Sequence, residues 1–521
     1  MSALSDPLIL AIDQGTQSVR ALLYDAGGAL VGRGHQPIEP YFSQHPGWAE
    51  QHPSFFWEQL GLACRKLWQH TQAGPGQVIG VTLTTQRGTV VTLDDQGQPL
   101  RPAMLWLDQR HAEISSPLRG PWGWLFRALR VDDTIDQFRR NAQANWLSQH
   151  EPELWGRTCH YLLLSGYLTY RLTGHFRDST AAQVGYLPFD FRRHRWAGPR
   201  NFKWQLMPLA RWQLPDLVPP GETLGRLTPE AATHLGLSAG LPLVAAASDK
   251  ACEVLGSGGT SADIACLSYG TTATINVTQD RYIEPVPLMP PYPSAMPGRY
   301  STEVMIYRGY WMVSWFKREF ALRERQLAAE RGIEPEALFD ELVTSVPPGS
   351  MGLMVQPYWS PGVRHPGPDA KGAMIGFGDV HTRAHIYRAM LEGLAYALRE
   401  GKERIEKRSG VAVRTLRVAG GGSRSDAAMQ LTADIFGMPA GRPTTRETSG
   451  LGAAMVAAYG LGLYPSVAAA AAAMKAPIDT FEPDATAAAL YRRLYTEVYL
   501  GMYRRLSPLY RHIRRITGYP Q

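Results

Sequence analysis

The sequence predicts an α/β protein made of two similar domains. At 521 residues the chain is too long for one ordinary core, and two domains of about 250 residues each is the natural division. Strand and helix patterns alternate along it, and a strand–turn–strand pattern at 12–25 returns at 267–280. We therefore expect domains 1–257 and 258–521, each beginning with a hairpin whose turn faces a shared cleft.

Composition indicates a folded protein and leaves the class of partner open. Hydrophobic residues make up 44% of the chain, and 53 basic against 46 acidic residues give a net charge of +7, with no polybasic block. This small excess suits an anionic small molecule as well as nucleic acid. The four cysteines lack CxxC spacing, which argues against disulfides or structural zinc and for a reducing compartment. No secretory leader pattern or bilayer-length apolar stretch occurs, so we expect a cytoplasmic protein without a nucleic-acid or membrane partner.

The first hairpin carries an acid beside its turn. "PLILAID" (7–13) reads as an apolar strand ending at Asp13, and "VRALLYD" (19–25) and "ALVGRG" (29–34) read as the next two strands. Gly15, Thr16 and Ser18 between them are ordinary turn residues. The turn joins strand to strand, whereas a P-loop joins strand to helix and needs GxxxxGK[ST], which the chain lacks. Residues 12–25 alone fit a plain turn or a hydroxyl-lined ligand site.

Further segments predict the elements between and after the hairpins. "QVIGVTLTTQRGTVVTLDDQG" (77–97) predicts strands around a turn at Gln86–Gly88, and 151–174 predicts helices. A long amphipathic helix with a glycine stop is expected over 385–410, and an alanine-rich surface helix over 466–477. "SGLGAAMVAAYG" (449–460), after Glu447, predicts a helix of small residues that packs closely on a neighbour.

Asp249 lies where a buried strand pattern passes into a helix pattern, in "GLPLVAAASDKACEVLGSG" (240–258). Ligands of α/β folds bind at the carboxyl ends of strands. A helix N-terminus would hold this carboxylate ionised and ready to accept a proton. The alternative is a helix N-cap without a chemical role.

Three consecutive glycines mark another strand end. In "LRVAGGGSRSDAAMQLTADIFGMP" (416–439) a strand ends at Ala419, Gly420–Gly422 follow, and a helix begins near Ser425 and Asp426. Glycines allow a flat ring or a phosphate to approach the backbone, and the helix start offers unpaired N–H groups. We favour a nucleotide contact over a plain strand-to-helix turn.

Together these motifs resemble the FGGY family of carbohydrate kinases, the xylulokinases in it more than the glycerol kinases. The resemblance covers nearly the whole chain and rests on these segments: "DQGTQSVRALLYD" (13–25), "HPGWAEQHPSFFWEQL" (45–60), "MLWLDQR" (104–110), "YGTT" (269–272), "GAMIGFGDVHTRAHIYRAMLE" (372–392), "GGGSRSD" (420–426) and "ADIFG" (433–437). Only Phe377 departs from the pattern at 372–392, where a smaller aliphatic residue is usual. The resemblance implies two actin-like, ribonuclease H-like domains with an active-site cleft between them.

The resemblance also implies a role for each matching residue. Asp249 would be the general base, and Asp13 and Asp249 would together hold Mg²⁺. Contacts with ATP would come from Thr16, Gln17, Ser18, Arg20, Gly270, Thr271, Gly421, Gly422 and Ser425. The sugar site would include Arg87, Gly88, Trp106, Asp108, Asp249 and Lys250. A homodimer is expected.

Departures from the family pattern bear on the substrate. Glycerol kinases carry Gln-Arg-Glu where this chain has Gln86-Arg87-Gly88, so a glutamate that typically binds glycerol is missing. Xylulokinases usually have Met-His-Gly there, and Lys250 replaces the usual amide after the base. Residues 360–372 look like a shortened xylulokinase loop. We expect a pentulose such as D-xylulose, with glycerol or another polyol as the alternative acceptor. An actin-like nucleotide-binding protein or a sugar sensor is the non-enzyme alternative.

Overall fold

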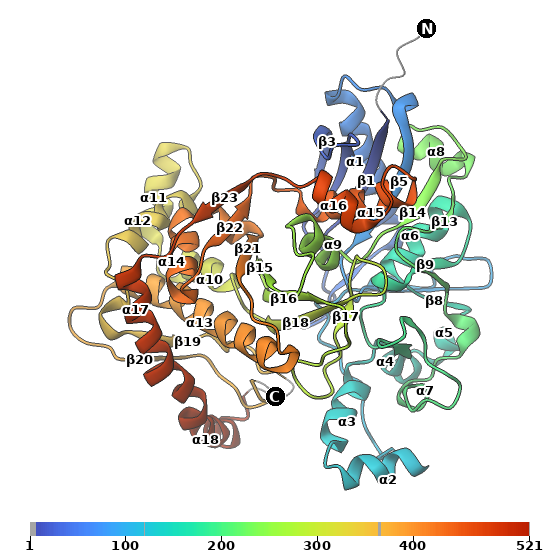
Figure 1. Ribbon diagram of the computed structural model, residues 1–521. Helices are drawn as coiled ribbons and strands as arrows, with labels where there is room; N and C mark the ends of the chain where they lie inside the picture. Colours follow the sequence, from blue (N-terminus) through green and yellow to red (C-terminus); the bar gives the residue numbers. More distant parts are fainter. Residues whose placement is uncertain (1–6, 119, 363–365, 520–521) are drawn as a thin grey trace. The chain divides into compact units, whose positions relative to one another are not determined.

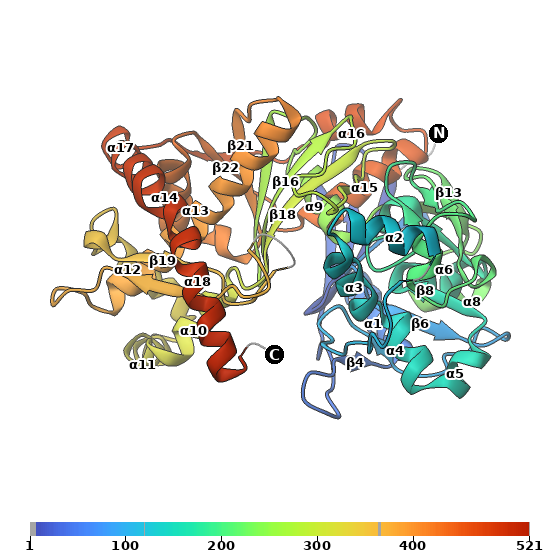
Figure 2. The ribbon, with the colours of Figure 1, turned by 90° about the horizontal axis from the view of Figure 1, so that it is seen from below.

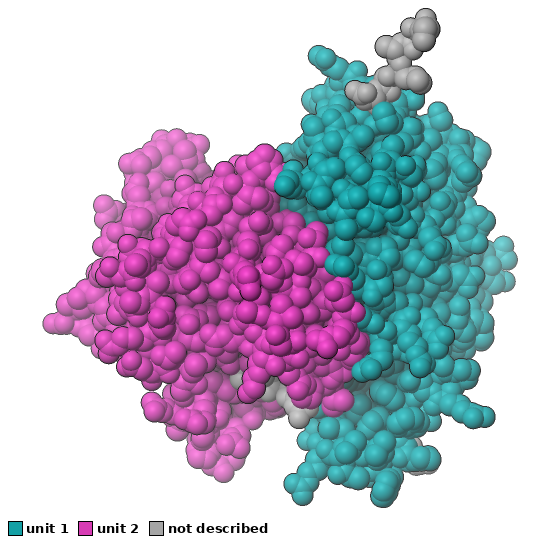
Figure 3. Space-filling view, in the orientation of Figure 1, with its two compact units in different colours: residues 1–256, 292–300, 447–475 teal, residues 257–291, 301–446, 476–521 magenta. Residues whose placement is uncertain are grey.

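The computed structural model describes residues 7–118, 120–362 and 366–519, and its contacts divide the chain into two compact units (Figure 3). Unit 1 comprises 1–256, 292–300 and 447–475, and unit 2 comprises 257–291, 301–446 and 476–521. These units differ from a division by a single cut after residue 257, because two later segments pack with unit 1. Residues 363–365 of the loop predicted to resemble that of xylulokinases lie outside the described residues.

Unit 1 is built on a six-stranded sheet in the order β13-β14-β5-β1-β2-β3. Its centre is the predicted hairpin of antiparallel strands β1 (Leu8–Gln14) and β2 (Ser18–Tyr24), with β3 (Leu30–Pro37) antiparallel to β2. On the other side of β1, β5 (Val78–Thr85) and β14 (Pro242–Ala245) are parallel, and β13 (Thr223–Arg226) closes the sheet antiparallel. The predicted three strands at the start of the chain are confirmed.

Helices cover both faces of this sheet. Leu8, Leu10 and Ile12 share a core with the apolar side of α1 (Pro53–His70). α15 (Thr448–Gly460) contacts β1, β5 and α9 (Asp249–Gly256). Because successive side chains of a strand point to opposite faces, Asp13 lies on the face away from Leu8, Leu10 and Ile12.

α9 and α15 pack through glycines, as the small-residue pattern predicts. A Cβ atom at Gly452 would lie 2.0 Å from the carbonyl oxygen of Cys252, and one at Gly256 would lie 2.0 Å from that of Thr448. Only glycine allows the two backbones this approach. The contact fixes the start of α15, and with it Glu447, within unit 1.

The rest of unit 1 carries short elements around the main sheet (Figure 1). A second sheet has the order β4-β7-β6-β8. The prediction of helices over 151–174 holds for α5 (Pro152–Arg157) and α6 (Leu164–Thr173) but is wrong between them, where β8 pairs with β6. A four-residue apolar run is too short for its periodicity to separate strand from helix. The remaining elements are β4 (Glu50–Gln51), β6 (Val90–Leu93), β7 (Ala103–Met104), β8 (His160–Leu163), β9 (Arg177–Ser179), β10 (Phe189–Asp190), β11 (Arg195–Trp196), β12 (Asp216–Val218), β17 (Tyr292–Pro293), α2 (Gly120–Ala128), α3 (Asp132–Asn141), α4 (Gln143–His150), α7 (Lys203–Leu206), α8 (Pro229–Leu235) and the alanine-rich α16 (Val467–Ala473).

Unit 2 repeats the strand order of unit 1. Its main strands follow the order β18-β16-β15-β21-β22-β23. β15 is antiparallel to β16 and parallel to β21, β21 is parallel to β22, and β22 is antiparallel to β23. The strands are β15 (Ile264–Tyr269), β16 (Ala273–Gln279), β18 (Tyr300–Ile306), β21 (Thr415–Ala419), β22 (Ala440–Pro443) and β23 (Ile478–Phe481). The second hairpin and the two-sheet α/β class are thereby confirmed.

Helices of unit 2 pack on this sheet and on one another (Figure 2). The predicted long helix is α13 (Arg383–Ser409), and it ends at Gly410 in a left-handed conformation. The other elements are α10 (Trp311–Glu319), α11 (Leu322–Arg331), α12 (Phe339–Thr344), α14 (Asp426–Phe436), α17 (Ala485–Arg493), a π-helix (Leu494–Tyr499), α18 (Leu500–Thr517), β19 (Met354–Gln356) and β20 (Ala373–Ile375). Across the described ranges, no helix has both the length and the apolar character needed to span a bilayer.

We expect Gly452→Ala to lower the free energy of unfolding by about 1–3 kcal/mol, because its methyl group would force α9 and α15 apart. Urea unfolding followed by far-UV circular dichroism measures the change. Gly156→Ala in α5 is the matched control, since nothing lies within 4 Å of its added Cβ. Equal stability of the two variants would contradict the close packing.

Candidate active site

The turn end of the first hairpin holds a buried cluster of charges. Asp13 is 4% exposed and pairs with Arg20 directly across the hairpin. Nη1 of Arg20 lies 3.2 Å from Oδ2 of Asp13 and 3.4 Å from Oε2 of Glu447. Nε of Arg33 lies 2.9 Å from Oε1 of Glu447. Glu447 therefore shares the cation that Asp13 uses.

Burial dominates the electrostatics of Asp13. Its pKa is raised to about 7, first by desolvation and then by the negative charges of Asp249, Glu447 and Glu253, while Arg20 opposes the rise. The attraction of Arg20 does not offset the desolvation of Asp13 and the repulsion by these carboxylates. The side chain therefore lies where an added cation would be stabilised.

Asp249 follows β14 and begins α9, as the sequence predicts. The hydroxyl of Thr84, near the end of β5, donates to the carbonyl oxygen of Ala247 at 2.8 Å and ties the two strand ends together. Oδ1 of Asp249 accepts from the backbone N–H of Lys250 at 2.7 Å. Both features place the carboxylate at the carboxyl end of parallel strands.

Opposing effects act on the pKa of Asp249. Desolvation raises its pKa, although Arg87, Lys250 and the N–H of Lys250 all act to lower it. Burial thus opposes the local positive charges, and the expectation that the helix start holds this group ionised stays a prediction. A raised pKa makes the carboxylate a stronger base.

The residues around Asp13 fit a hydrated Mg²⁺. Carboxylate oxygens are the ligands that this ion prefers, and it commonly keeps several waters. Within the described ranges, no three His, Cys, Asp or Glu side chains are grouped closely enough to hold a metal. A site of one or two carboxylates completed by water is therefore the arrangement that these residues would provide.

The turn of the first hairpin is linked to the predicted sugar element by two hydrogen bonds. The Thr16 hydroxyl donates to Oε1 of Gln86 at 2.8 Å and accepts from the indole N–H of Trp106 at 3.2 Å. Gly15 N–H closes the turn on the carbonyl oxygen of Ser18 at 3.1 Å. Thr16, Gln86 and Trp106 thus form one polar chain, although their positions in the sequence are far apart.

Gln14 is a residue that sequence reasoning missed. It is fully buried at the end of β1, and neither amide atom has a hydrogen-bond partner in the described part of the chain. A buried polar group without a partner costs about 1–3 kcal/mol, and such a group is a candidate for contact with a ligand. The only signal in the sequence is an amide inside an apolar strand pattern.

Arg87 and Gly88 occupy the turn after β5. The guanidinium of Arg87 lies over the ring of Tyr292, 5.3 Å from its centroid, and Tyr292 belongs to the segment 292–300 that joins unit 1. Gly88 has φ of +69°, which favours glycine whatever the ligand. Arg87 also acts on Asp249 electrostatically. Of Arg87 and Gly88, Arg87 is therefore the residue whose side chain acts on Asp249, the candidate base.

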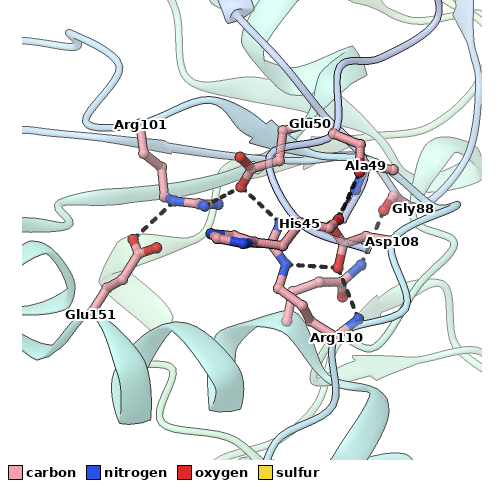
Figure 4. Close-up of polar contacts among 10 residues, drawn as sticks. His45, Ala49, Glu50, Gly88, Arg101, Asp108, Arg110 and Glu151 are labelled. Carbon is pink, nitrogen blue, oxygen red and sulfur yellow. Dashed lines mark hydrogen bonds and ion pairs between the residues drawn. The ribbon is translucent and has the colours of Figure 1, made fainter. Parts of the chain in front are cut away.

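Asp108 lies in a buried ion-pair network (Figure 4). Its carboxylate accepts from Nε of Arg110 at 2.8 Å, from Nη2 of Arg110 at 2.6 Å and from the N–H of Ala49 at 2.8 Å. Arg110 also pairs with Glu50 at 2.8 Å. These contacts give Asp108 a positioning role for the loop that carries Trp106, and direct sugar contact stays a prediction.

The guanidinium of Arg110 packs against two indole rings that also contact each other. It lies 4.1 Å from the ring centroid of Trp48 and 4.5 Å from that of Trp146. Arg101 extends the network by pairing with both Glu50 and Glu151. Trp106, by contrast, is 40% exposed. The buried ion-pair network therefore supports a loop whose indole ring is accessible.

In unit 2, the three glycines after β21 differ in how closely their surroundings pack. Gly420 has φ of +90°, and a Cβ at Gly422 would lie 2.2 Å from the Tyr310 ring. A Cβ at Gly421 would meet nothing within 4 Å. Ser425 caps α14 by accepting from the N–H of Ala428 at 2.9 Å. Structural packing explains Gly420 and Gly422, and leaves Gly421 with room for a ligand.

The second hairpin turn is anchored to the start of α10. The carbonyl oxygens of Gly270 and Thr271 accept from the N–H groups of Tyr310 at 3.0 Å and of Trp311 at 3.3 Å. Thr271 is exposed. Their predicted contacts with ATP, like those of Gly421, Gly422 and Ser425, stay predictions.

Comparison with known proteins assigns the family. Residues 8–256 match the N-terminal domain of the FGGY family of carbohydrate kinases, and residues 265–461 match its C-terminal domain. The chain belongs to this family. It is therefore an ATP-dependent carbohydrate kinase, a phosphotransferase with an alcohol group as acceptor.

Individual relatives of this FGGY kinase cover nearly its whole length. A xylulose kinase of Staphylococcus epidermidis is 29% identical over 98% of this chain and 99% of its own. A glycerol kinase of Dechloromonas aromatica is 31% identical over 92% of this chain and 94% of its own. The solved structure of a gluconate kinase from Lactobacillus acidophilus superposes with a TM-score of 0.81 at 20% identity, over 98% of this chain and 100% of that one. The predicted actin-like fold is confirmed.

We expect the stability of the FGGY kinase to fall as pH rises through the range set by Asp13. Its pKa is about 7 in the folded state against an ordinary value of 3.8. Between these values the folded state holds the proton more tightly, so the free energy of unfolding decreases with pH. Asp13→Asn removes this loss. Its stability relative to the natural chain should grow by about 2 kcal/mol from about pH 5.5 to pH 8.

Chemical denaturation without divalent cations measures this difference at each pH. Asp95→Asn, at an exposed loop position, is the control and should give a constant difference. A pH-independent difference for Asp13→Asn would contradict the raised pKa of Asp13.

Proposed function

We propose that this FGGY kinase transfers the γ-phosphate of ATP to a hydroxyl group of a pentulose such as D-xylulose. The observation that carries the proposal is Asp249, a partly buried carboxylate with a raised pKa at the end of β14, with Arg87 and Lys250 beside it. The similarity to xylulose kinases over almost the full chain supports this acceptor class. The glycine at position 88, where glycerol kinases carry a glutamate, disfavours glycerol.

In this proposal Asp249 accepts the proton of the attacking hydroxyl. Phosphoryl transfer depends on positioning and on electrostatic stabilisation more than on covalent catalysis, so one base and a set of hydrogen-bond donors suffice. Thr16, Gln17, Ser18 and Arg20 would bind phosphate oxygens from the first hairpin. Mg²⁺, when bound near Asp13 and Asp249, would neutralise phosphate charge.

The acceptor would lie near Arg87, Gly88, Trp106 and Lys250. Trp106 offers an accessible apolar ring face, and its N–H is already held by Thr16. Lys250 forms an ion pair with Glu253 at 3.0 Å, which turns its ammonium group along α9. A polyol remains the second candidate, because a glycerol kinase is similarly related to the chain.

Asp249→Asn should lower kcat by about 10²–10⁴, because the amide keeps the shape but cannot accept the proton. ATP binding should persist, since the assigned ATP contacts lie elsewhere. Coupled ADP release measures turnover, and calorimetric titration measures ATP affinity. Asp95→Asn should leave both unchanged. Unchanged turnover of Asp249→Asn would overturn the assignment of the base.

Acceptor specificity separates the two substrate candidates. D-xylulose or D-ribulose should stimulate ADP release with a kcat/KM at least tenfold above those of glycerol and erythritol, because the glutamate that glycerol kinases carry is missing at position 88. The measurement is initial-rate kinetics over this panel. Preference for glycerol would overturn the pentulose proposal and leave the kinase class intact.

A further inference from the structure

A buried carboxylate in unit 1, outside the site described above, organises the end of β9. Asp178 is 1% exposed. Its carboxylate accepts three hydrogen bonds of 2.8 Å, from the Ser165 hydroxyl in α6, from the side-chain amide of Gln183 and from the backbone N–H of Ser179. Burial raises the pKa of Asp178 to about 6 while these donors act to lower it, so the group is largely ionised at neutral pH. Asp178 thus fixes the path of the chain that follows it.

This stretch of chain is bonded to the segment that leads to Asp249. The Ser179 hydroxyl donates to the carbonyl oxygen of Ala246 and accepts from the N–H of Ala181 at 3.2 Å. The carbonyl oxygen of Ala181 in turn accepts from the N–H of Ser248 at 3.1 Å. Ser248 is the neighbour of Asp249 in the sequence. Two hydrogen bonds therefore hold the end of β9 against the backbone just before the candidate base.

The backbone before Asp249 depends on such bonds for its position. Residues 246–248 lie between β14 and α9 and belong to neither element. The Thr84 hydroxyl of β5 holds the carbonyl oxygen of Ala247, and the end of β9 holds the residues on both sides of it. The base is thus carried by a short connection that two different elements of unit 1 keep in place.

We propose that Asp178 and Ser179 are positioning residues for Asp249 in phosphoryl transfer, an inference that rests on the proposed role of Asp249 as the base. Both side chains are buried and bonded within the protein, so neither is a candidate for contact with the acceptor. Ser179 holds the backbone beside the base, and Asp178 holds Ser179.

The chemistry of a general base explains why such support matters. The base must come within about 2.6–3.2 Å of the hydroxyl oxygen whose proton it accepts. A misplacement of about 1 Å caused by a change far from the reacting atoms can cost about 10² in rate. Asp249 begins a helix and follows a connection without regular structure, so its carboxylate moves with residues 246–248.

The test is a double-mutant cycle between Ser179→Ala and Asp249→Asn in the full-length protein. ADP release is measured at saturating ATP, with whichever of D-xylulose, D-ribulose, glycerol and erythritol gives the natural chain its highest turnover. Ser179→Ala should lower kcat about tenfold in the natural chain and less than about twofold in Asp249→Asn, because an asparagine accepts no proton wherever it lies. The KM for ATP should stay the same in Ser179→Ala.

A second variant and a matched control complete the experiment. Asp178→Asn keeps the shape of the side chain but replaces one acceptor oxygen by a donor, and it should follow the pattern of Ser179→Ala. Thr158→Val is the control, because the buried Thr158 hydroxyl also donates to a backbone carbonyl oxygen, that of Leu154 at 3.1 Å, at the end of α5. It should leave kcat unchanged in both backgrounds.

The cycle separates positioning from a general contribution to folding. A general loss of structure would lower kcat by the same factor with or without the base, and that result would overturn the positioning role while leaving the assignment of the base intact. An unchanged kcat of Ser179→Ala in the natural chain would do the same. An unchanged kcat of Asp249→Asn would instead overturn the base itself, and the positioning role with it.

Discussion

The carboxylate of Asp13 is the group on which the candidate site depends. It is buried at the end of a strand, and Arg20 is shared between it and Glu447. A buried carboxylate in this situation keeps its proton or gains a cation. Phosphoryl transfer supplies such a cation with its substrate. In the proposed function, the same burial that raises the pKa of Asp13 would favour binding of that cation.

Close backbone packing and a buried ion pair together support the candidate site. Glycines let α15 approach α9, and this places Glu447 beside the hairpin. The ion pair of Asp108 and Arg110, packed against two indole rings, fixes the loop that presents Trp106. Rigid support behind accessible groups is what a site needs to hold reacting atoms in place.

Local pattern was enough to predict the hairpins, the strand end at Asp249 and the long helix α13, because each depends on neighbours in sequence. The same applies to the two-sheet fold, since the Gly-Thr turn recurs in the same strand context. The strand at 160–163 was not predicted, because its extended conformation depends on pairing with β6 and is not visible in its own hydrophobic periodicity. The sign of the pKa shift of Asp249 and the unpaired amide of Gln14 depend on burial by distant segments, which no local pattern contains.

The segment 447–475 has a further consequence, for the order in which the chain is made. Tyr24 in β2 donates to the carbonyl oxygen of Glu447, a contact between residues 423 positions apart. α15 covers the face of β1 that carries Asp13, so the first 256 residues leave the ribosome with part of their core uncovered. Unit 1 is completed only after most of unit 2 has been synthesised. Such a topology has a high contact order, which slows folding and exposes apolar surface during synthesis.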